Sequence, residues 1–554
     1  MVWHVPRRKQ RVRTPSLVNN LHSQSSQTVG RRHGLLPFLF MKISRFESLR
    51  HYLPQTVLIV SLLTIYFHTL APGLTWANGG SDGGDLIAAA ATGGIAHPTG
   101  YPLYLVLARL FQYLPVGSLA FRTNLMSAVF TALTAAMIFN VVTRSISQKP
   151  EPLWLPGMVA AYAFGLAPLI WSQAVITEVY ALQTFLVVLI LYFYTVPISA
   201  FHSRAGQRDS WRGFLLGLGM SNHVTTILIV PMALLIGSTH SLPDRDEKSQ
   251  SADRWFRSLQ FDSYALRRQL LWFGVGLALY LLLPLRALAH PPVNWGNPVT
   301  FERFWWLVTG QLYQSYYLQF NWLESWEHIQ AGAALLLQQF GFVGLAIGMA
   351  GLIVFGSRSR ITILTAWIAV TYAVFAYLYR SADSYTYLIP TFLCFAIWIG
   401  LGTAGFISAF PGHTAAFRPG IGFLGLGIFA IRVLTLMSGV DASHDLRAES
   451  FGREVLAAAP KDAILFAKGD QAVFALWYFH FALKERPDLI VIAEDLLHFD
   501  WYQETLQKTY PSLVVPDPFP WPETMAVANP LHVICYVQYS SLTDLECSGP
   551  LSPP

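Results

Sequence analysis

Two aspartates, Asp82 and Asp85, stand in the glycine-rich residues 81–85 and are the first candidates for chemistry. A carboxylate at a boundary between water and membrane can act as a general base that takes the proton of an acceptor hydroxyl. The same spacing resembles a capping box, in which Asp82 would start a helix over residues 85–92 that two glycines end. The residues alone leave both interpretations open.

Other polar side chains with chemical potential follow along the sequence, and each has an ordinary structural explanation. An acid at the start of a helix is favourable without any function, and an arginine can extend to the lipid headgroups. These residues nevertheless map to one side of the predicted topology, whereas scattered structural residues would use both sides. They are His97, Tyr101, Glu178, Tyr180, His223, Arg286 and Asp383.

The composition indicates that membrane-spanning helices must position these residues. Of the 554 residues, 53% are hydrophobic and 12% are charged, and the mean hydropathy is +0.41. A soluble domain carries about a quarter charged residues, so this sequence has too few polar side chains to cover a water-facing surface. The positive-inside rule explains the net charge of +6 by basic loops between apolar blocks, without a nucleic-acid partner.

The N-terminal residues 1–50 predict a basic, disordered, cytoplasmic tail. Because Met41 follows a stretch without apolar periodicity, translation could start there as well as at Met1. The apolar block Thr56–Pro72 is too long for the core of a signal peptide, and we interpret it as a signal anchor.

The remaining apolar blocks predict a polytopic α-helical membrane domain over residues 51–440, with about ten or eleven spans. Its first external loop is expected at residues 73–121. Residues 213–237 look like one span, yet the charged loops before and after this segment should both be cytoplasmic. If both loops are cytoplasmic, the segment must cross the membrane an even number of times. We therefore expect it to enter and return as two half-spans, with a break near residues 217–222.

The C-terminal residues 441–554 differ in composition and predict a small extracytoplasmic α/β domain. Short β-like runs alternate there with helical stretches. Cys535 and Cys547 can pair if this segment faces an oxidising compartment. The β-like runs are 463–467, 489–493 and 532–536, and the helical stretches are 472–484 and 502–509.

Several enzyme classes lack their sequence signatures here. There is no Walker A sequence, no Rossmann glycine fingerprint and no cysteine or histidine cluster with zinc spacing. A secondary transporter or lipid flippase would share the many spans and the broken helix, and it stays an alternative. A non-catalytic membrane assembly protein, with Asp82 only as a helix cap, is another.

Ordered sequence strings resemble a family of multi-pass proteins, long classed as of unknown function, whose animal relatives are protein O-mannosyltransferases. That family is similar to the C-type glycosyltransferases. The resemblance covers about residues 55–400 and, more loosely, the C-terminal domain. The strings include Ser81-Asp82-Gly83-Gly84-Asp85-Leu86-Ile87, His97-Pro98-Thr99-Gly100-Tyr101-Pro102, Thr177-Glu178-Val179-Tyr180, Ser221-Asn222-His223, Leu283-Pro284-Leu285-Arg286 and Asn294-Trp295-Gly296-Asn297-Pro298.

The resemblance implies that a monosaccharide passes, with inversion, from a polyprenyl-phosphate-linked donor to a protein or glycan acceptor on the extracytoplasmic face. Asp82 matches the family's aspartate and is expected to be the general base, while Asp85 stands where the family usually has glutamate. His97 and Arg286 are candidates for the donor phosphate. The other expected substrate-binding residues are Tyr101, Glu178, Tyr180, His223 and Asp383.

No cofactor and no metal ligand are predicted with certainty, although some C-type enzymes use a divalent cation. The expected partners are the lipid-linked donor, the acceptor and membrane lipid, and not nucleic acid. The expected location is a bacterial inner membrane.

Overall fold

The computed structural model describes residues 36–146, 154–195, 205–241, 259–317, 322–355, 360–409, 427, 430–516, 523–540 and 543–548. By its internal contacts the chain divides into residues 1–52 and residues 53–554. In the first part, residues 1–35 of the predicted tail lie outside the described residues. Helix α1 (Leu36–Thr69) begins before the predicted anchor, and the disordered state of the tail stays a prediction. All that follows concerns the second part.

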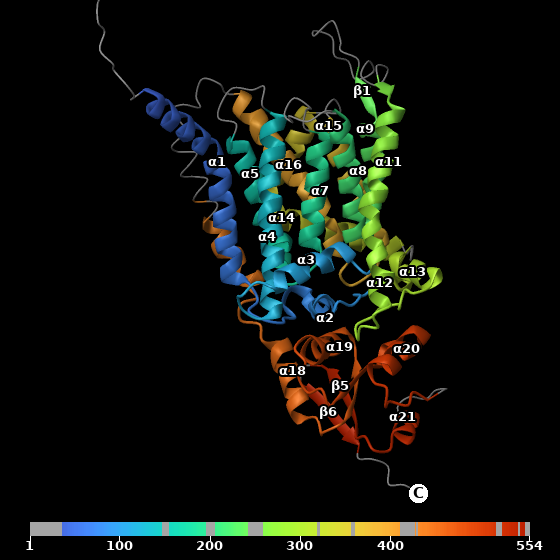
Figure 1. Cartoon of the computed structure of the whole chain (residues 1–554). Helices are drawn as coiled ribbons and strands as arrows, with labels where there is room; N and C mark the ends of the chain where they lie inside the picture. The colour runs from blue at the N-terminus through green and yellow to red at the C-terminus, as the bar shows by residue number, and fades with distance from the viewer. Residues whose placement is uncertain are drawn as a thin grey trace, which may run out of the picture. The chain divides into compact units, whose positions relative to one another are not determined.

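Apolar helices form a bundle, and the C-terminal part of the chain forms a smaller domain beside one end of it (Figure 1). These stretches become helical because the bilayer offers backbone amides no partner outside the segment. The bundle helices are α4 (Leu119–Ser145), α5 (Trp154–Gly165), α6 (Pro168–Ala174), α7 (Tyr180–Thr195), α8 (Ala205–Asn222), α9 (Val230–Gly237), α11 (Ser263–Leu277), η4 (Ala278–Leu281), α12 (Leu282–Ala287), α14 (Trp322–Phe355), α15 (Arg360–Leu378), η7 (Ser384–Leu388) and α16 (Ile389–Ala409).

Five helices within the described residues are long and apolar enough to cross a membrane, or six if one bent pair counts as a span. The bent pair is α5 with α6, which meet at 69°. The bend lies where Pro168 starts a new helix. Three shorter apolar helices, Leu53–Thr69, Tyr180–Thr195 and Ala430–Val440, accompany them. The total of ten or eleven spans stays a prediction.

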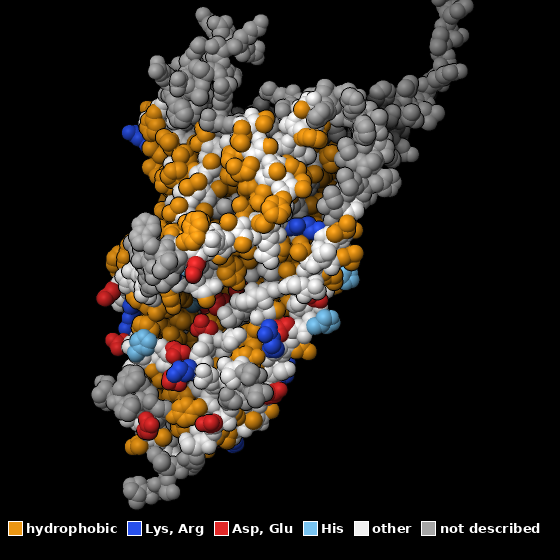
Figure 2. Space-filling model, turned by 180° about the vertical axis from the view of Figure 1, so that it is seen from behind, with side chains coloured by type: hydrophobic (Ala, Val, Ile, Leu, Met, Phe, Trp, Pro, Cys, Tyr) orange, Lys and Arg blue, Asp and Glu red, His pale blue; other side chains and the backbone are white. Residues whose placement is uncertain are grey.

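The bundle exposes a broad apolar surface to its surroundings. In Figure 2, hydrophobic side chains cover the visible face of the bundle, while carboxylates, lysines, arginines and histidines gather over the C-terminal domain and the bundle end next to it. Phe342 and Val343 on α14 are 79% and 73% exposed. An uncovered surface of this kind is stable in lipid and not in water, as expected for a multi-pass membrane protein.

The segment over residues 213–237 enters and returns, as the charge pattern predicts. Arg212 in α8 donates a hydrogen bond from Nη1 to the carbonyl oxygen of Gly237 at the end of α9 (3.3 Å), so the two ends lie at one level. The turn is at His223, which caps the short helix η3 (Val224–Leu228). It therefore lies after the predicted glycines, through which α8 continues to Asn222.

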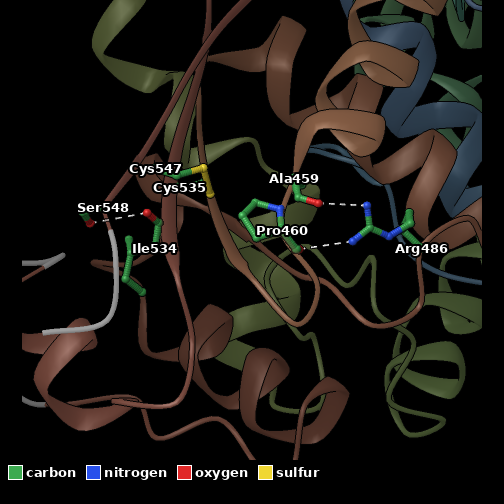
Figure 3. Close-up of a disulfide and its surroundings, with 7 residues drawn as sticks. All are labelled: Ala459, Pro460, Arg486, Ile534, Cys535, Cys547 and Ser548. Atoms are coloured by element: carbon green, nitrogen blue, oxygen red, sulfur yellow. Dashed lines mark hydrogen bonds between the residues drawn. A yellow bond between two sulfur atoms is a disulfide. The ribbon is translucent and has the colours of Figure 1, made fainter. Parts of the chain in front are cut away.

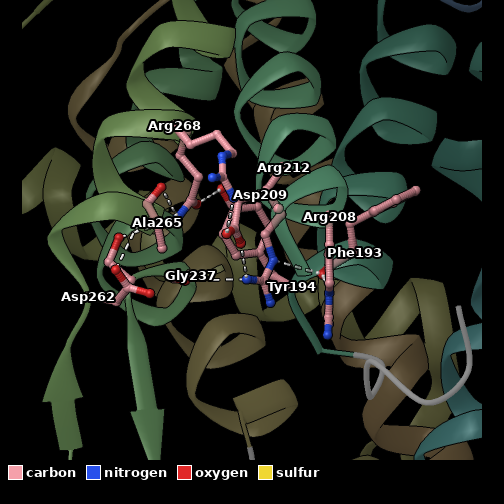
Figure 4. A network of polar contacts seen from close by, with 12 residues as sticks. Phe193, Tyr194, Arg208, Asp209, Arg212, Gly237, Asp262, Ala265 and Arg268 are labelled. Atoms are coloured by element: carbon pink, nitrogen blue, oxygen red, sulfur yellow. Dashed lines mark hydrogen bonds and ion pairs between the residues drawn. The ribbon is translucent and has the colours of Figure 1, made fainter. Parts of the chain in front are cut away.

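Arginines fasten this re-entrant pair to its neighbours (Figure 4). Arg208 and Arg212 both donate from Nε to the carbonyl oxygen of Phe193, at 3.0 and 3.1 Å. Asp209 accepts from Arg212 at 3.2 Å and lies 3.8 Å from Arg268 of α11. Beyond α9, the strands β1 (Thr239–Ser241) and β2 (Leu259–Phe261) pair antiparallel.

The predicted first external loop folds into three short helices. They are η1 (Ala77–Asp82), α2 (Gly83–Thr92) and α3 (Pro102–Gln112). Gly93 ends α2 with a φ of +70°, which glycine adopts without steric cost. Gly83 to Ala90 are buried, because α2 lies in one hydrophobic core with the C-terminal domain.

The C-terminal domain is α/β, as predicted, with one mixed sheet of strand order β4-β3-β5-β6. β3 pairs parallel with β4 and β5, and β6 closes the sheet antiparallel to β5. The sequence reading missed β6 and α18. The elements are α18 (Arg447–Ala458), β3 (Ile464–Lys468), α19 (Asp470–Trp477), the π-helix η8 (Tyr478–Ala482), β4 (Ile490–Ala493), η9 (Glu494–Leu496), α20 (Asp500–Thr509), α21 (Glu523–Ala528), β5 (Ile534–Tyr539) and β6 (Thr543–Ser548).

Two features fasten this domain internally (Figure 3). Cys535 and Cys547 form a disulfide between directly paired positions of β5 and β6. Arg486 donates from Nη1 to the carbonyl oxygen of Ala459 (3.1 Å) and from Nη2 to that of Pro460 (3.2 Å), which joins the end of α18 to the start of β4.

Two sets of polar contacts join the C-terminal domain to the bundle's loops. The backbone N–H of Trp76 donates to Oδ2 of Asp445 (2.9 Å), and that of Leu74 donates to Oε1 of Glu449 (3.1 Å). On the other side, Arg303 of α13 (Phe301–Val308) binds Glu504 of α20 through two hydrogen bonds of 2.7 Å. The helix η5 (Gln311–Tyr316) follows α13. The domain is thus clamped to two separate loops.

Candidate active site

Asp82 lies at the junction of η1 and α2, where the sequence also allowed a helix cap. Its side chain makes no capping hydrogen bond. It accepts a hydrogen bond from Ser81 Oγ at 3.3 Å, and 35% of it is exposed. The capping-box interpretation is therefore wrong, and the carboxylate is available to a ligand.

Asp85 has the opposite environment, one turn along α2. Its side chain is fully buried. Oδ2 accepts from the backbone N–H of His97 (3.0 Å) and faces His97 Nδ1 at 2.7 Å, while Oδ1 accepts from Trp295 Nε1 (3.0 Å). With every approach occupied by protein, Asp85 can orient His97 but cannot contact a substrate directly.

His97 links the two aspartates. Its Nε2 lies 3.6 Å from Oδ2 of Asp82, on the side opposite Asp85. Burial alone would lower the pKa of His97, but the charge of Asp82 and the hydrogen bond and charge of Asp85 outweigh it and raise the pKa to about 9. At neutral pH the ring is therefore an imidazolium between two carboxylates.

The same charges act on Asp82. Burial raises its pKa above the usual range, the nearby imidazolium of His97 lowers it, and the carboxylates of Asp383 and Asp85 raise it again. The net direction is upward, which makes Asp82 a stronger base than a free aspartate while His97 favours its ionised form.

Glu178 and Asp383 complete the acidic side of the site. Glu178 precedes α7 and is 6% exposed; burial, followed by the charge of Asp82, raises its pKa well above normal. Asp383 precedes η7 and faces the hydroxyl of Tyr180 at 3.5 Å. The predicted acids from three distant segments therefore converge near Asp82.

An aromatic cluster borders these acids on the bundle side. The rings of Tyr101 and His223 are 5.8 Å apart, and His223 is 6.0 Å from Tyr180 and 5.8 Å from Tyr387. Tyr101 also lies 5.1 Å from the ring of His97. The cluster joins the re-entrant turn to the first external segment, and Tyr387 was not among the residues predicted.

Arg286 is the predicted residue that these contacts do not bring into the cluster. It lies at the end of α12 and donates from Nη1 to the carbonyl oxygen of Gly94 (3.2 Å). Asp82 precedes α2 and Gly94 follows it, so Arg286 lies at the opposite end of that helix from Asp82.

Residues from the C-terminal domain also reach the site, and the candidate list missed them. Phe474 stacks on His97 with ring centres 6.4 Å apart, and Gly84 allows the close contact, since a Cβ there would overlap the carbonyl oxygen of Phe474. Burial, followed by the charge of Asp82, raises the pKa of Asp470 to about 6. The dipeptide Gly469-Asp470 could have indicated this contribution, but it lies in the C-terminal domain, where the family resemblance is weaker.

Within the described residues, no group of three or more histidine, cysteine, aspartate or glutamate side chains is arranged to hold a metal ion. The imidazolium of His97 supplies positive charge beside Asp82. The arrangement suits proton abstraction from a hydroxyl that reaches the exposed carboxylate.

Comparison with known proteins identifies two matching regions. A sequence profile described as the protein O-mannosyl-transferase TMEM260 N-terminal domain matches residues 82–243, and one described as TMEM260-associated domain 2 matches residues 448–536. The first region holds Asp82, Asp85, His97, Tyr101, Glu178, Tyr180 and His223, and the second holds Asp470 and Phe474, while Arg286 and Asp383 lie outside both.

Curated relatives extend the similarity over most of the chain. The mouse "Protein O-mannosyl-transferase TMEM260" is 26% identical over 466 residues, which are 79% of this chain and 62% of that protein. The Dictyostelium discoideum protein of the same name is 23% identical over 81% of this chain and 58% of its own length. The chain thus spans about 60% of the length of these relatives.

A solved structure shares the fold. The crystal structure of ArnT from Cupriavidus metallidurans bound to undecaprenyl phosphate superposes with a TM-score of 0.54 at 13% identity, covering 87% of this chain and 92% of that one. The expected fold class is therefore confirmed: the chain is a multi-pass membrane protein with a C-type glycosyltransferase fold and a small C-terminal α/β domain, and it is similar in both parts to the TMEM260 protein O-mannosyl-transferase family.

Proposed function

We propose that the chain transfers a monosaccharide from a polyprenyl-phosphate donor to an acceptor hydroxyl on the extracytoplasmic face of a membrane. The observation that carries the proposal is the pairing of a partly exposed Asp82 with a buried, charged His97. The names of the curated relatives support a mannosyl group and a protein acceptor. The undecaprenyl phosphate bound to ArnT supports a lipid-linked donor.

In the proposed reaction, the acceptor oxygen attacks the anomeric carbon from the face opposite the phosphate. Its proton passes to Asp82, the new glycosidic bond forms, and the bond between the anomeric carbon and the phosphate oxygen breaks. The polyprenyl phosphate leaves with that electron pair, so a single displacement inverts the anomeric centre. One ionised carboxylate is sufficient for this step.

The supporting residues have distinct roles in this proposal. His97 keeps Asp82 ionised and in place, and Asp85 positions His97 through two hydrogen bonds. Glu178, Tyr180 and Asp383 line the approach to Asp82. Arg286, on the other side of α2, stays a candidate for the donor phosphate, because a guanidinium matches phosphate oxygens.

The location on the extracytoplasmic side has independent support. The disulfide Cys535–Cys547 lies in the domain that contacts Asp82's segment, and disulfides persist in oxidising compartments. A bacterial inner membrane stays a prediction, since the curated relatives come from mouse and Dictyostelium discoideum.

The test measures release of polyprenyl phosphate by the purified full chain. The donors are polyprenyl-phosphate mannose and polyprenyl-phosphate glucose, each with and without peptides that contain serine and threonine. Asp82→Asn should lower turnover about 10²- to 10⁴-fold, because the amide cannot accept the proton. The variant should still fold, since Asp82 makes no capping bond, and a lower thermal midpoint would report the lost charge contact with His97.

Asp500→Asn is the matched control, because Asp500 is an exposed aspartate at the start of α20, outside the site. It should turn over the donor like the wild type. Equal turnover by Asp82→Asn and the wild type would remove Asp82 from the base role. No turnover of either donor by the wild type would leave a transporter or an assembly protein as the better interpretation.

A further inference from the structure

A polar cavity of about 340 Å³ lies between the first external segment and the C-terminal domain. The external segment contributes Trp76, Gly79 and Ser81 to its wall. Ser81 directly precedes Asp82 and donates a hydrogen bond to its carboxylate. The cavity wall therefore includes the residue directly before the proposed base.

The other wall lies where the sheet of the C-terminal domain changes direction. From β3 the chain goes to β4 on one side and then to β5 on the other, so the connections diverge between β3 and β5. In open α/β sheets, ligands bind at the carboxyl ends of the strands at such a point. Lys468 ends β3 and Tyr539 ends β5, and both line the cavity.

The walls are held in place before any ligand binds. The ring of Trp76 packs 4.2 Å from that of Tyr539 and 5.4 Å from that of Phe451. Beyond β3, the backbone N–H of Gly469 donates to Asp495 (3.0 Å). A preformed site of this kind lowers the ordering cost of binding.

The lining chemistry suits a polypeptide and does not suit a lipid tail. Gln471 and Gln538 each present an amide that donates and accepts, which complements the alternating N–H and C=O groups of an extended peptide. Trp76 is only 5% exposed, because Phe451 and Tyr539 cover its ring, so it offers no open face on which a sugar could stack. The polar lining also disfavours an apolar lipid tail.

We propose that this cavity is the acceptor subsite, and that it holds the polypeptide segment next to the serine or threonine that receives the sugar. The inference rests on the proposed function and gives its polypeptide acceptor a place in the structure. The C-terminal domain then contributes to acceptor binding, while the bundle side contributes the donor and Asp82 the base.

The experiment measures sugar transfer by the full chain to synthetic peptides that carry a single serine or threonine, with peptide concentration varied. The variants are Gln538→Ala and Gln471→Ala. Each removes an amide from the cavity wall and should raise the KM for peptide about tenfold, as expected for a lost hydrogen bond, with kcat little changed. Gln507→Ala on the exposed face of α20 is the matched control and should behave as the wild type.

Donor hydrolysis without peptide is measured in parallel and separates the two levels of the proposal. Hydrolysis by the wild type, together with an unchanged peptide KM in both variants, would overturn the acceptor subsite alone. Transfer only to glycans, or equal KM changes in Gln507→Ala, would also overturn it. A wild type that consumes no donor under any condition would overturn the proposed function, and the subsite with it.

Discussion

Asp82 and Asp85 are the same residue type three positions apart, yet their surroundings give them different capabilities. Asp85 is enclosed by His97 and Trp295, while Asp82 is partly open and follows Ser81, which lines a cavity. The imidazolium of His97 between them neutralises part of the acidic cluster. A site with one accessible base therefore results from two similar carboxylates.

The protonation of His97 predicts a pH dependence. Its pKa of about 9 in the folded chain lies above the value of about 6.5 expected when unfolded. The imidazolium thus contributes stability that is fully present below pH 6.5 or so and is lost as the pH rises through about 9. We expect the transfer rate to fall over the same alkaline range, measured as kcat/KM against pH.

Asp85→Asn checks that assignment. Asp85 contributes a hydrogen bond and a charge that raise the pKa of His97, so the alkaline decline in this variant should move to lower pH. A residue with a purely structural role would reduce activity equally at every pH. An unshifted decline would therefore show that Asp85 does not act through His97.

For single residues, the sequence could predict the candidates for the site but not which of them is accessible to a ligand and which only positions another residue. The first-loop acids and His97 are recognisable from local spacing and resemblance. The burial of Asp85 comes from Trp295, and the stacking on His97 comes from Phe474, both hundreds of residues away. Contacts of that range leave no local pattern in the sequence.

Close contact between helices α2 and α19 fixes the C-terminal domain against the site. Gly84 makes this possible, since any side chain there would meet the backbone of Phe474. The re-entrant α8 likewise approaches α11 through Gly213 and Gly217, where a Cβ would overlap backbone atoms of α11. Glycines at helix contacts of this kind allow backbones to approach closely.

Gly84→Ala should therefore destabilise the chain by about 1–3 kcal/mol, the usual cost of overpacking a tight contact, and should reduce transfer. The measurement is the thermal midpoint together with turnover. Gly274→Ala in α11 is the matched control, because the space around Gly274 is open to 4 Å, and it should be neutral or slightly stabilising. Equal behaviour of the two variants would contradict the proposed role of this contact.

Most helices and strands could be predicted from the apolar pattern and the distribution of charge. The long spans, the re-entrant pair and three of the four sheet strands follow from hydropathy, charge parity and short β-like runs. The bend at Pro168 was missed because both arms of the span are apolar. Helix α18 was missed although its buried residues Ala448, Phe451, Val455 and Leu456 recur at helical spacing.

The whole molecule places the acidic site, the disulfide and the C-terminal domain at one end of the bundle, and the arginine network of α8 at the other (Figures 1 and 4). This division agrees with the positive-inside rule applied to the sequence. The predicted first external loop becomes a buried layer between bundle and domain. The sequence could predict the bundle and the C-terminal domain separately. It could not predict this layer, because the layer forms only when the two pack together.

Cysteine labelling in intact cells or sealed vesicles tests this orientation. A cysteine placed in residues 244–258, within the charged segment 244–268, should resist a membrane-impermeant maleimide from outside, whereas Lys508→Cys on α20 should react. The native Cys394 is buried and should contribute little background. Reaction of the 244–268 position from outside would invert the proposed topology and place Asp82 in the cytoplasm.

The hydrogen bond between Trp76 and Asp445 joins residues 369 positions apart. During translation, the segment that carries Asp82 leaves the ribosome long before the partners that hold it. A nascent chain can therefore possess every membrane anchor and still lack an assembled reaction centre. Under the proposed function, competence would be acquired late in synthesis, so unfinished chains in the membrane would neither consume the lipid donor nor modify neighbouring proteins.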